Sequence, residues 1–238
     1  MNPDHEVAFK AKPAQPVPER GLLSAAGFNR QILLAAGPAG GSVGTHILDS
    51  MTAVKLWPGL FWAGPVLGAP MAVMALEELG RRGAREILFL GLAGSLDPEL
   101  PPGTLISPES GLSTEGTSVH YPAPSRPDEA LRARVLAADN GIVGGTIWST
   151  DGIHRETMGL VDKQRRAGAV FVDMETTALW AAARFRGLAL AVLLVVSDVL
   201  DGPDHHTGFH RPEYKAALAR ASEIAFKVMG FEKGEGRA

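Results

Sequence analysis

Two carboxylates stand at positions where the chain could bind a sugar or transfer a proton. Glu175 follows the apolar segment 169–172, and Asp198 follows the unbroken apolar run from Leu188 to Val196. An uninterrupted apolar run of this kind predicts a strand that is buried on both faces of a parallel sheet. Because ligands bind beyond the carboxyl ends of such strands, we expect both carboxylates to face a ligand.

Asp198 is a candidate proton donor. A carboxyl group at the end of a buried strand lies half in the apolar interior, where burial favours its protonated form and lets it deliver a proton. The alternative is that Asp198 caps the turn after the strand, as aspartate often does. Spacing alone gives the two interpretations equal weight.

Glu175 is a candidate sugar ligand. Asp173 and Glu175 flank Met174 at a predicted strand end, so at least one of the two acids must face the crevice. A carboxylate can accept two hydrogen bonds from a vicinal diol such as that of ribose. The alternative is that an acid in the first turn of a helix is favoured by the helix dipole without any function.

Two glycine-rich segments are candidate ligand contacts. The segment from Gly64 to Pro70 lies between a predicted strand and a predicted helix, which would place free N–H groups at a helix N-terminus, where anions bind. Residues 91–95 form a second predicted turn, whose glycines permit close approach of a ligand. The first segment is neither a Walker loop nor a dinucleotide-binding fingerprint, and without a partner motif it is more often a plain tight turn.

The elements that would position these residues alternate between strands and helices. Short apolar segments predict strands, and segments rich in alanine, leucine and glutamate predict helices. Predicted strands cover 31–36, 60–63, 86–90, 142–148, 169–172 and 188–196, and predicted helices cover 71–82, 128–139, 155–167, 175–186 and 212–228. The alternation indicates an α/β fold with a mostly parallel sheet covered on both faces.

Composition narrows the class of protein. A chain of 238 residues could form one large α/β domain or two small ones, and the spacing of the elements favours one. Four prolines among residues 1–20 predict an extended N-terminal arm, which leaves 21–238 as the catalytic domain. The absence of cysteine excludes disulfides and thiolate chemistry.

Charge and hydropathy argue against nucleic acid and membranes as binding partners. The net charge of −3 provides no electrostatic footprint for nucleic acid or an anionic membrane. The N-terminus lacks the apolar core of a secretory signal, and the longest apolar run is too short to span a membrane, so we expect a cytoplasmic protein. No metal site is expected, because the cluster formed by Asp201, Asp204, His205 and His206 lies in a Gly/Pro segment without regular spacing.

Ordered motifs between Gly64 and Asp198 resemble the nucleoside phosphorylase superfamily, which includes uridine phosphorylase, hexameric purine nucleoside phosphorylase and the methylthioadenosine nucleosidases. These motifs are Gly64–Glu78, Gly91–Leu96, Gly103–Ile106, Glu115–Tyr121, Ser149–Asp151, Val172–Glu175 and Ser197–Asp198. The resemblance implies a single-domain three-layer α/β/α fold with a mixed, partly barrel-like central sheet. It also implies a homo-oligomer, either a dimer or a hexamer.

The resemblance implies roles for the matching residues. Glu175 matches the glutamate that binds ribose hydroxyls, Met174 the methionine packed against the sugar, and Asp198 the aspartate that protonates N7 of a purine. His5 lies where some hexameric members place a histidine that reaches a neighbour's ribose. The full set of candidate substrate contacts is Gly91, Leu92, Ala93, Gly94, Asp151, His154, Arg155, Asp173, Met174, Glu175, Ser197 and His5, with Gly64 and Gly68 as candidate phosphate contacts.

The chain also departs from the family pattern. Phosphorolytic members carry Gly-Asp-Pro followed by an arginine near the N-terminus, whereas segment 35–38 of this chain reads Ala-Ala-Gly-Pro. They also carry a second arginine that binds phosphate, at the position where this chain has Phe89. The glutamate cluster of the hydrolytic members is also absent. His154 and Arg155 could read a base edge from a shifted position, although the start of a solvated helix is the simpler explanation and is favoured.

These patterns favour a nucleoside phosphorylase. We expect it to cleave the N-glycosidic bond of a purine nucleoside or of uridine, with inorganic phosphate as co-substrate and no cofactor. Its partners would be small molecules rather than nucleic acid or membrane. Two alternatives stay open at this point: a hydrolytic nucleosidase, and a member that binds nucleosides without catalysis.

Overall fold

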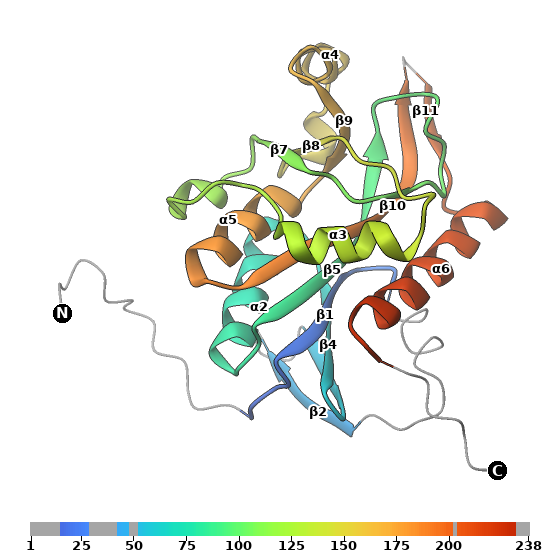
Figure 1. The fold of residues 1–238 in the computed structure, drawn as a ribbon. Helices are drawn as coiled ribbons and strands as arrows, with labels where there is room; N and C mark the ends of the chain where they lie inside the picture. Colours follow the sequence, from blue (N-terminus) through green and yellow to red (C-terminus); the bar gives the residue numbers. More distant parts are fainter. Residues whose placement is uncertain (1–14, 29–41, 48–51, 202–203, 232–238) are drawn as a thin grey trace.

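The computed structural model describes residues 15–28, 42–47, 52–201 and 204–231 (Figure 1). Its strands are β1 (Arg20–Ala25), β2 (Ser42–Ile47), β3 (Thr52–Trp57), β4 (Leu60–Val66), β5 (Glu86–Ser95), β6 (Leu105–Ile106), β7 (Ser110–Ser113), β8 (Thr146–Ser149), β9 (Ala169–Asp173), β10 (Ala189–Asp201) and β11 (Asp204–Thr207). Its helices are α2 (Ala69–Arg81), α3 (Glu129–Ala138), α4 (Met158–Arg166), α5 (Thr176–Arg186) and α6 (Pro212–Val228), with the short 3₁₀ helices η2 (Ser118–His120) and η3 (Ile153–Arg155).

The strands form one mixed sheet with β5 at its centre. β5 pairs in parallel with β1 and with β10, whereas β9 pairs with it in the antiparallel sense. β4, β3 and β2 extend the sheet beyond β1, and β8 and β7 extend it beyond β9. The predicted mixed central sheet is therefore confirmed, although the expectation of a mostly parallel sheet overlooked the antiparallel β2–β3–β4 extension.

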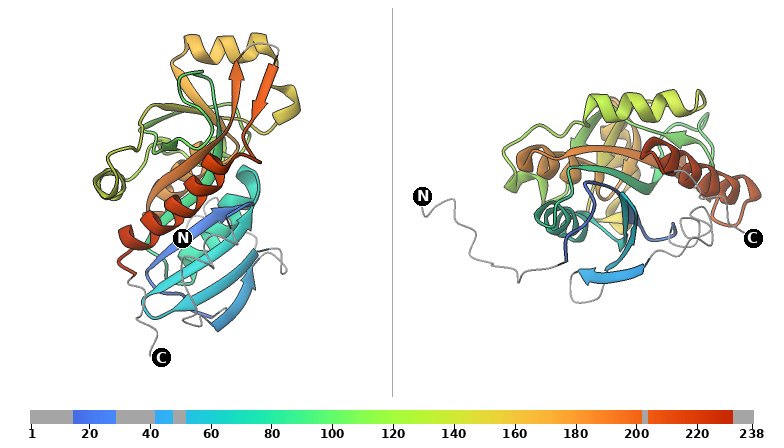
Figure 2. Two further views of the ribbon diagram at one scale, coloured as in Figure 1. Left: turned by 90° about the vertical axis from the view of Figure 1, so that its right-hand side faces the viewer. Right: turned by 60° about the horizontal axis from the view of Figure 1, so that its bottom comes forward.

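Helices cover both faces of this sheet. α2 and α5 pack on one face, against side chains that include Phe89 and Val192. α3 and α6 pack on the other face, against side chains that include Leu90 and Leu193. Alternate residues of a strand point to opposite faces, so the fully apolar strands supply both layers of the core. Figure 2 shows β10 between α3 and α2, which confirms the three-layer α/β/α arrangement.

β5 changes its strand partner partway along its length. Residues 86–90 pair with β1, whereas Gly94 and Ser95 pair with β9. On that side, residues 91–93 have no strand partner among the described residues. Open α/β sheets bind ligands at points where the strand order changes. The fold therefore places the candidate site beside residues 91–93.

Two predicted turns begin inside strands, because β4 and β5 each run further than the sequence predicts. β5 runs on to Ser95, and Gly64 lies inside β4, opposite Ala53. After Asp198, β10 continues to Asp201, which is opposite Asp204 of β11. Gly202 and Pro203 lie outside the described residues. Glycine inside a strand can mark a place where another group approaches closely. A Cβ at Gly64 would lie 2.5 Å from the Ser24 hydroxyl oxygen, so packing rather than turning requires that glycine.

The N-terminal predictions fall partly outside the described residues. The predicted strand at 31–36 and most of the predicted arm lie there, as do His5 and the side chains of His205 and His206. At the described end of the arm, Val17 is buried, and its N–H donates to the Arg82 carbonyl at 2.9 Å. No described helix has the length and apolar character needed to span a membrane.

Candidate active site

Glu175 is buried where the N-termini of two helices meet. It immediately precedes α5, and its Oε1 accepts a hydrogen bond of 2.6 Å from the N–H of Gly68, which immediately precedes α2. Gly68 has φ of 77°, a conformation that favours glycine. The N–H of Gly68 serves the carboxylate here, and the expected role of Gly68 as a phosphate contact stays a prediction. Gly64, inside β4, does not lie at a helix N-terminus.

The surroundings of Glu175 oppose its ionisation. Burial raises the pKa of Glu175 to about 8, and the charges of Asp173 and Asp151 also raise it, whereas hydrogen bonds from the N–H groups of Gly68 and Met174 lower it. A ligand that donates hydrogen bonds to this carboxyl group would stabilise the ionised form. The protonation state of Glu175 should therefore be coupled to ligand binding.

Asp173 holds the elements around Glu175 in place. One carboxylate oxygen accepts a hydrogen bond of 2.5 Å from the Ser149 hydroxyl at the end of β8, and the other accepts from the N–H and hydroxyl of Thr176 at the start of α5. Burial raises the pKa of Asp173 above its ordinary value, against these hydrogen bonds. Both oxygens are used within the protein, which gives Asp173 a positioning role, and its expected contact with the sugar stays a prediction.

Asp198 lies beyond a β-bulge in β10 rather than at the strand end. Val196 is opposite Ala93 and Asp198 is opposite Gly94, so Ser197 is the extra residue. The Ser197 hydroxyl donates to Oδ1 of Asp198 at 2.5 Å and lies 3.3 Å from the Ala93 carbonyl oxygen, a second acceptor. Ser197 therefore orients Asp198, and the alternative that Asp198 caps a turn is wrong.

Two neighbours define the space around the Asp198 carboxylate. Oδ2 lies 3.3 Å from the point where a Cβ on Gly94 would stand, so glycine keeps this side open. On another side lies Tyr214 of α6; burial raises the pKa of Tyr214 to about 12, and the charge of Asp198 adds to that rise. The half-buried carboxylate therefore adjoins the backbone of β5 just beyond residues 91–93.

Gly94 connects the two candidate carboxylates. It is opposite Asp198 on β10 and opposite Val172 on β9, and Glu175 follows Val172 by three residues. The structure therefore brings Glu175 and Asp198 to the same end of the sheet. The segment from Gly91 to Gly94, including Leu92 and Ala93, runs between the strands that carry them.

The remaining predicted residues lie at the edge of this region. Met174, which lies between Asp173 and Glu175 in the chain, is half-buried, and Asp151 is exposed. Oδ2 of Asp151 accepts the N–H of Gly116 at 2.8 Å, so this carboxylate also serves to hold a loop. His154 and Arg155 are exposed on η3, and their proposed contact with a base stays a prediction.

Sequence reasoning missed Glu115, a buried carboxylate that organises the same loop. Its oxygens accept from the N–H groups of Thr117 and Ser118 and from the hydroxyls of Ser113 and Thr177. Burial alone would raise the pKa of Glu115, but the hydrogen bonds from Ser118, Ser113 and Thr117 hold it below its ordinary value. The only sequence signal is an acid within Ser-Thr-Glu-Gly-Thr-Ser, where each neighbour can donate.

We expect Glu115→Ala to lower the free energy of unfolding by about 2–4 kcal/mol, because several buried donors would lose their shared acceptor. Glu115→Gln should lose less than half as much, since the two hydroxyls can rotate to accept from an amide. Denaturant unfolding of both variants measures the difference. Equal losses for alanine and glutamine would contradict this account of the loop.

Comparison with known proteins agrees with this architecture. A family profile described as "Phosphorylase superfamily" matches residues 44–229. The guanosine phosphorylase of Halorubrum lacusprofundi is 33% identical over 137 residues, which cover 55% of this chain and 57% of that protein. The chain spans about half the length of the curated relatives it matches.

Solved structures share the fold across nearly the whole chain. A purine nucleoside phosphorylase from Toxoplasma gondii in complex with immucillin-H has a TM-score of 0.76 at 14% identity, covering 90% of this chain and 91% of its own. An AMP nucleosidase from Bacteroides thetaiotaomicron has a TM-score of 0.72 at 19% identity, covering 90% and 88%. The profile match over residues 44–229 and these folds lead to one conclusion: the chain belongs to the phosphorylase superfamily.

Proposed function

We propose that this protein cleaves the N-glycosidic bond of a nucleoside and transfers the ribosyl group to inorganic phosphate. The observation that carries the proposal is the placement of buried Glu175 and half-buried Asp198 at the same end of the sheet, on either side of Gly94. The products would be the free base and ribose 1-phosphate. No cofactor enters this reaction.

The two carboxylates would have separate roles. Glu175 would accept hydrogen bonds from the ribose 2′- and 3′-hydroxyls, which fixes the sugar. As the bond between C1′ and the base nitrogen breaks, its electron pair moves to the base, and Asp198 donates a proton to the base. A phosphate oxygen then forms the new bond to C1′, on which positive charge has developed. Because N7 of a purine can take the proton, Asp198 favours a purine nucleoside as substrate.

Phosphate would bind beside residues 91–93, whose backbone lacks a strand partner on one side among the described residues. The position of β1 also revises the sequence comparison with phosphorolytic members. Because β1 ends at Ala25, the segment that follows the first strand contains Gly27 and, three residues later, Arg30. Arg30 lies outside the described residues, and its place after the glycine makes it the first cation to test.

Phosphate dependence is the direct test. We expect the purified protein to release base from inosine, guanosine or adenosine only when phosphate is present, with ribose 1-phosphate formed in equal amount. Uridine should react more slowly, because uracil has no N7 to protonate. Chromatography of base and sugar products measures both expectations.

Three outcomes separate the candidate functions. Base release that is unaffected by phosphate would establish hydrolysis, the alternative that the AMP nucleosidase fold and Phe89 keep open. Thermal stabilisation by nucleosides without any base release would establish a binding protein. If phosphorolysis holds, Arg30→Gln should raise the KM for phosphate at least tenfold, while Arg20→Gln, an exposed arginine at the start of β1, should not.

A further inference from the structure

A cavity of about 400 Å³ lies at the end of α5 opposite to Glu175. One wall is the face of α5 that carries Trp180, Ala183 and Arg184, and the other walls are the start of β10, the loop before α3 and Arg85. Its volume falls within the range of small-molecule sites, about 300–1,000 Å³. It is separate from the candidate active site, which lies at the N-terminus of the same helix.

Trp180, one of the residues that line the cavity, carries a buried donor without an acceptor. Trp180 is 1% exposed, and its Nε1 is the single buried side-chain nitrogen or oxygen within the described ranges that has no hydrogen-bond partner. The Cε3 and Cζ3 edge of the indole packs over Gly111 of β7, so the Nε1 edge is turned away from that strand. Unpaired buried N–H groups are costly and rare in native proteins, and each one calls for a specific explanation.

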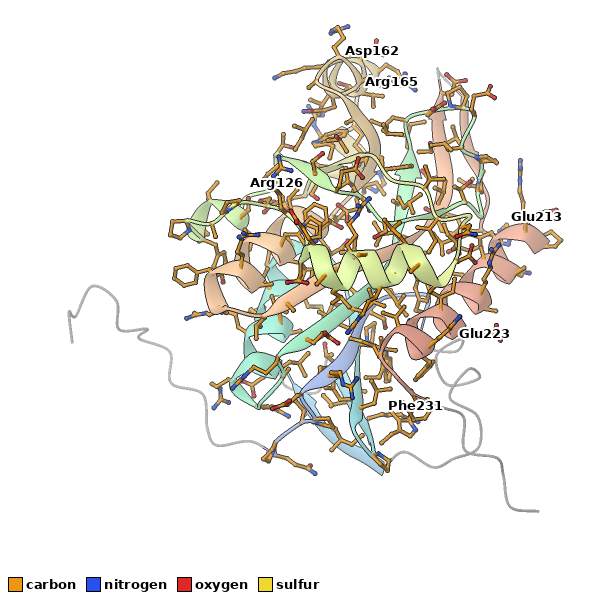
Figure 3. All side chains as sticks on the ribbon, viewed as in Figure 1. Arg126, Asp162, Arg165, Glu213, Glu223 and Phe231 are labelled. Atoms are coloured by element: carbon orange, nitrogen blue, oxygen red, sulfur yellow. The ribbon has the colours of Figure 1, made fainter. Side chains whose placement is uncertain are left out.

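The same cavity is lined by arginines from three segments. The guanidinium groups of Arg126 and Arg184 have no hydrogen bond or ion pair with any residue that the structure describes. Figure 3 shows Arg126 beside the start of α3, on the side of the molecule that carries α5. Arg85 donates through Nη1 to the carbonyls of Gly80 and Ala84, and its other N–H groups are not used in those bonds.

Three of the lining side chains are cationic and one is anionic. The one carboxylate, Asp128, accepts the N–H of Leu131 as the cap of α3. Arg184 also complements the dipole of α5 from its last turn, but that role does not account for Arg126 or for the indole N–H. The cavity therefore suits an anionic ligand that is rich in acceptors.

We propose that this cavity binds a phosphate group, supplied either by inorganic phosphate or by the phosphate ester of a sugar. Planar guanidinium groups bind phosphate through paired hydrogen bonds. The indole N–H is covered in this structure and would donate to a further oxygen once the side chains over it move aside. The ligand would satisfy the buried donor of Trp180 and neutralise arginines from separate segments. This site is independent of the co-substrate site beside residues 91–93.

Fluorine NMR of protein labelled with 5-fluorotryptophan tests the proposal directly. The chain has four tryptophans, and Trp180→Phe identifies the resonance of Trp180. On titration with inorganic phosphate or ribose 5-phosphate, we expect this resonance to shift and saturate, and the ligand with the lower Kd identifies the source. The double variant Arg126→Gln/Arg184→Gln should weaken binding at least tenfold.

Controls separate this site from the active site and from ionic strength. Arg166→Gln/Arg211→Gln removes the same charge from other exposed positions and should leave the titration unchanged. Asp198→Asn should also leave it unchanged, whereas the Arg126/Arg184 double variant should still release base at the wild-type rate. No shift of the Trp180 resonance, equal shifts of all four resonances, or an unaltered Kd in the double variant would each overturn the proposal.

Discussion

Asp198→Asn should slow base release from a purine nucleoside by about 10²–10⁴-fold, the usual contribution of a positioned general acid. Asparagine keeps the size of the side chain and an oxygen for the Ser197 hydroxyl, but it cannot transfer a proton to the departing base. Nucleoside binding should stay within a few-fold of wild type. Steady-state kinetics with inosine and phosphate, together with calorimetric binding, measure the two effects.

The leaving group supplies the sharper comparison. Nitrophenolate leaves from a nitrophenyl riboside without being protonated. Asp198→Asn should therefore cleave this substrate at nearly the wild-type rate. Asp201→Asn is the matched control, because this exposed carboxylate lies on the same strand and should have no effect on either substrate. Equal slowing of both substrates by Asp198→Asn would show that the residue positions the site rather than donating a proton.

Glu175→Gln is expected to remove most of the pH dependence of stability between pH 6 and 9, above the range in which Asp173 titrates. The folded protein keeps the proton of Glu175 up to a pKa of about 8, whereas an unperturbed glutamate releases it at 4.5. The stabilisation from this group is therefore complete below the lower value and is lost as the pH rises through the higher one. The wild type should lose on the order of 2–4 kcal/mol across this interval, and the variant much less.

Melting curves at closely spaced pH values measure this difference, which corresponds to roughly 5–15 °C in Tm. Glu129→Gln, at an exposed position in the first turn of α3, should keep the wild-type slope. If Glu175→Gln kept the wild-type dependence of Tm on pH, the group responsible for that dependence would not be Glu175.

The same residue should make nucleoside binding depend on pH. Ribose hydroxyls that donate to Glu175 favour its carboxylate, so binding near pH 7 should release a proton, and the KM for nucleoside should fall as the pH rises towards 8. Calorimetry in buffers of different ionisation enthalpy counts the proton. In Glu175→Gln we expect a KM that is at least tenfold higher and does not vary with pH.

The buried hydrogen-bond network lies beside Glu175 and not beside Asp198, so Glu175→Gln should destabilise the fold more than Asp198→Asn. Ser149 joins Asp173 to the N–H of Thr177, and Thr177 joins Glu115 to the start of α5. These contacts hold the helix that Glu175 precedes, and they do not include Asp198. Asp198 depends instead on the bulge at Ser197, which is local to β10.

Elements with strong local signals could be predicted from the sequence. α6 begins at Pro212 and ends at Val228 as predicted, because proline is favoured in the first turn and the apolar residues recur at helical spacing. The end of α5 at Gly187 is also confirmed, since this residue has φ of 67°. β1 and β3 were not predicted, because six-residue segments that mix apolar with polar residues resemble loops until a neighbouring strand pairs with them.

The sequence by itself determined the α/β fold, the superfamily and the two carboxylates at one end of the sheet, because apolar runs, helix stop signals and ordered motifs depend on residues close along the chain. Only the tertiary structure decided what each polar group contacts. It assigned the N–H of Gly68 to Glu175, both oxygens of Asp173 to Ser149 and Thr176, and Asp198 to a bulge. Hydrogen-bond partners and burial are set by segments far apart in the chain, and local composition does not encode them.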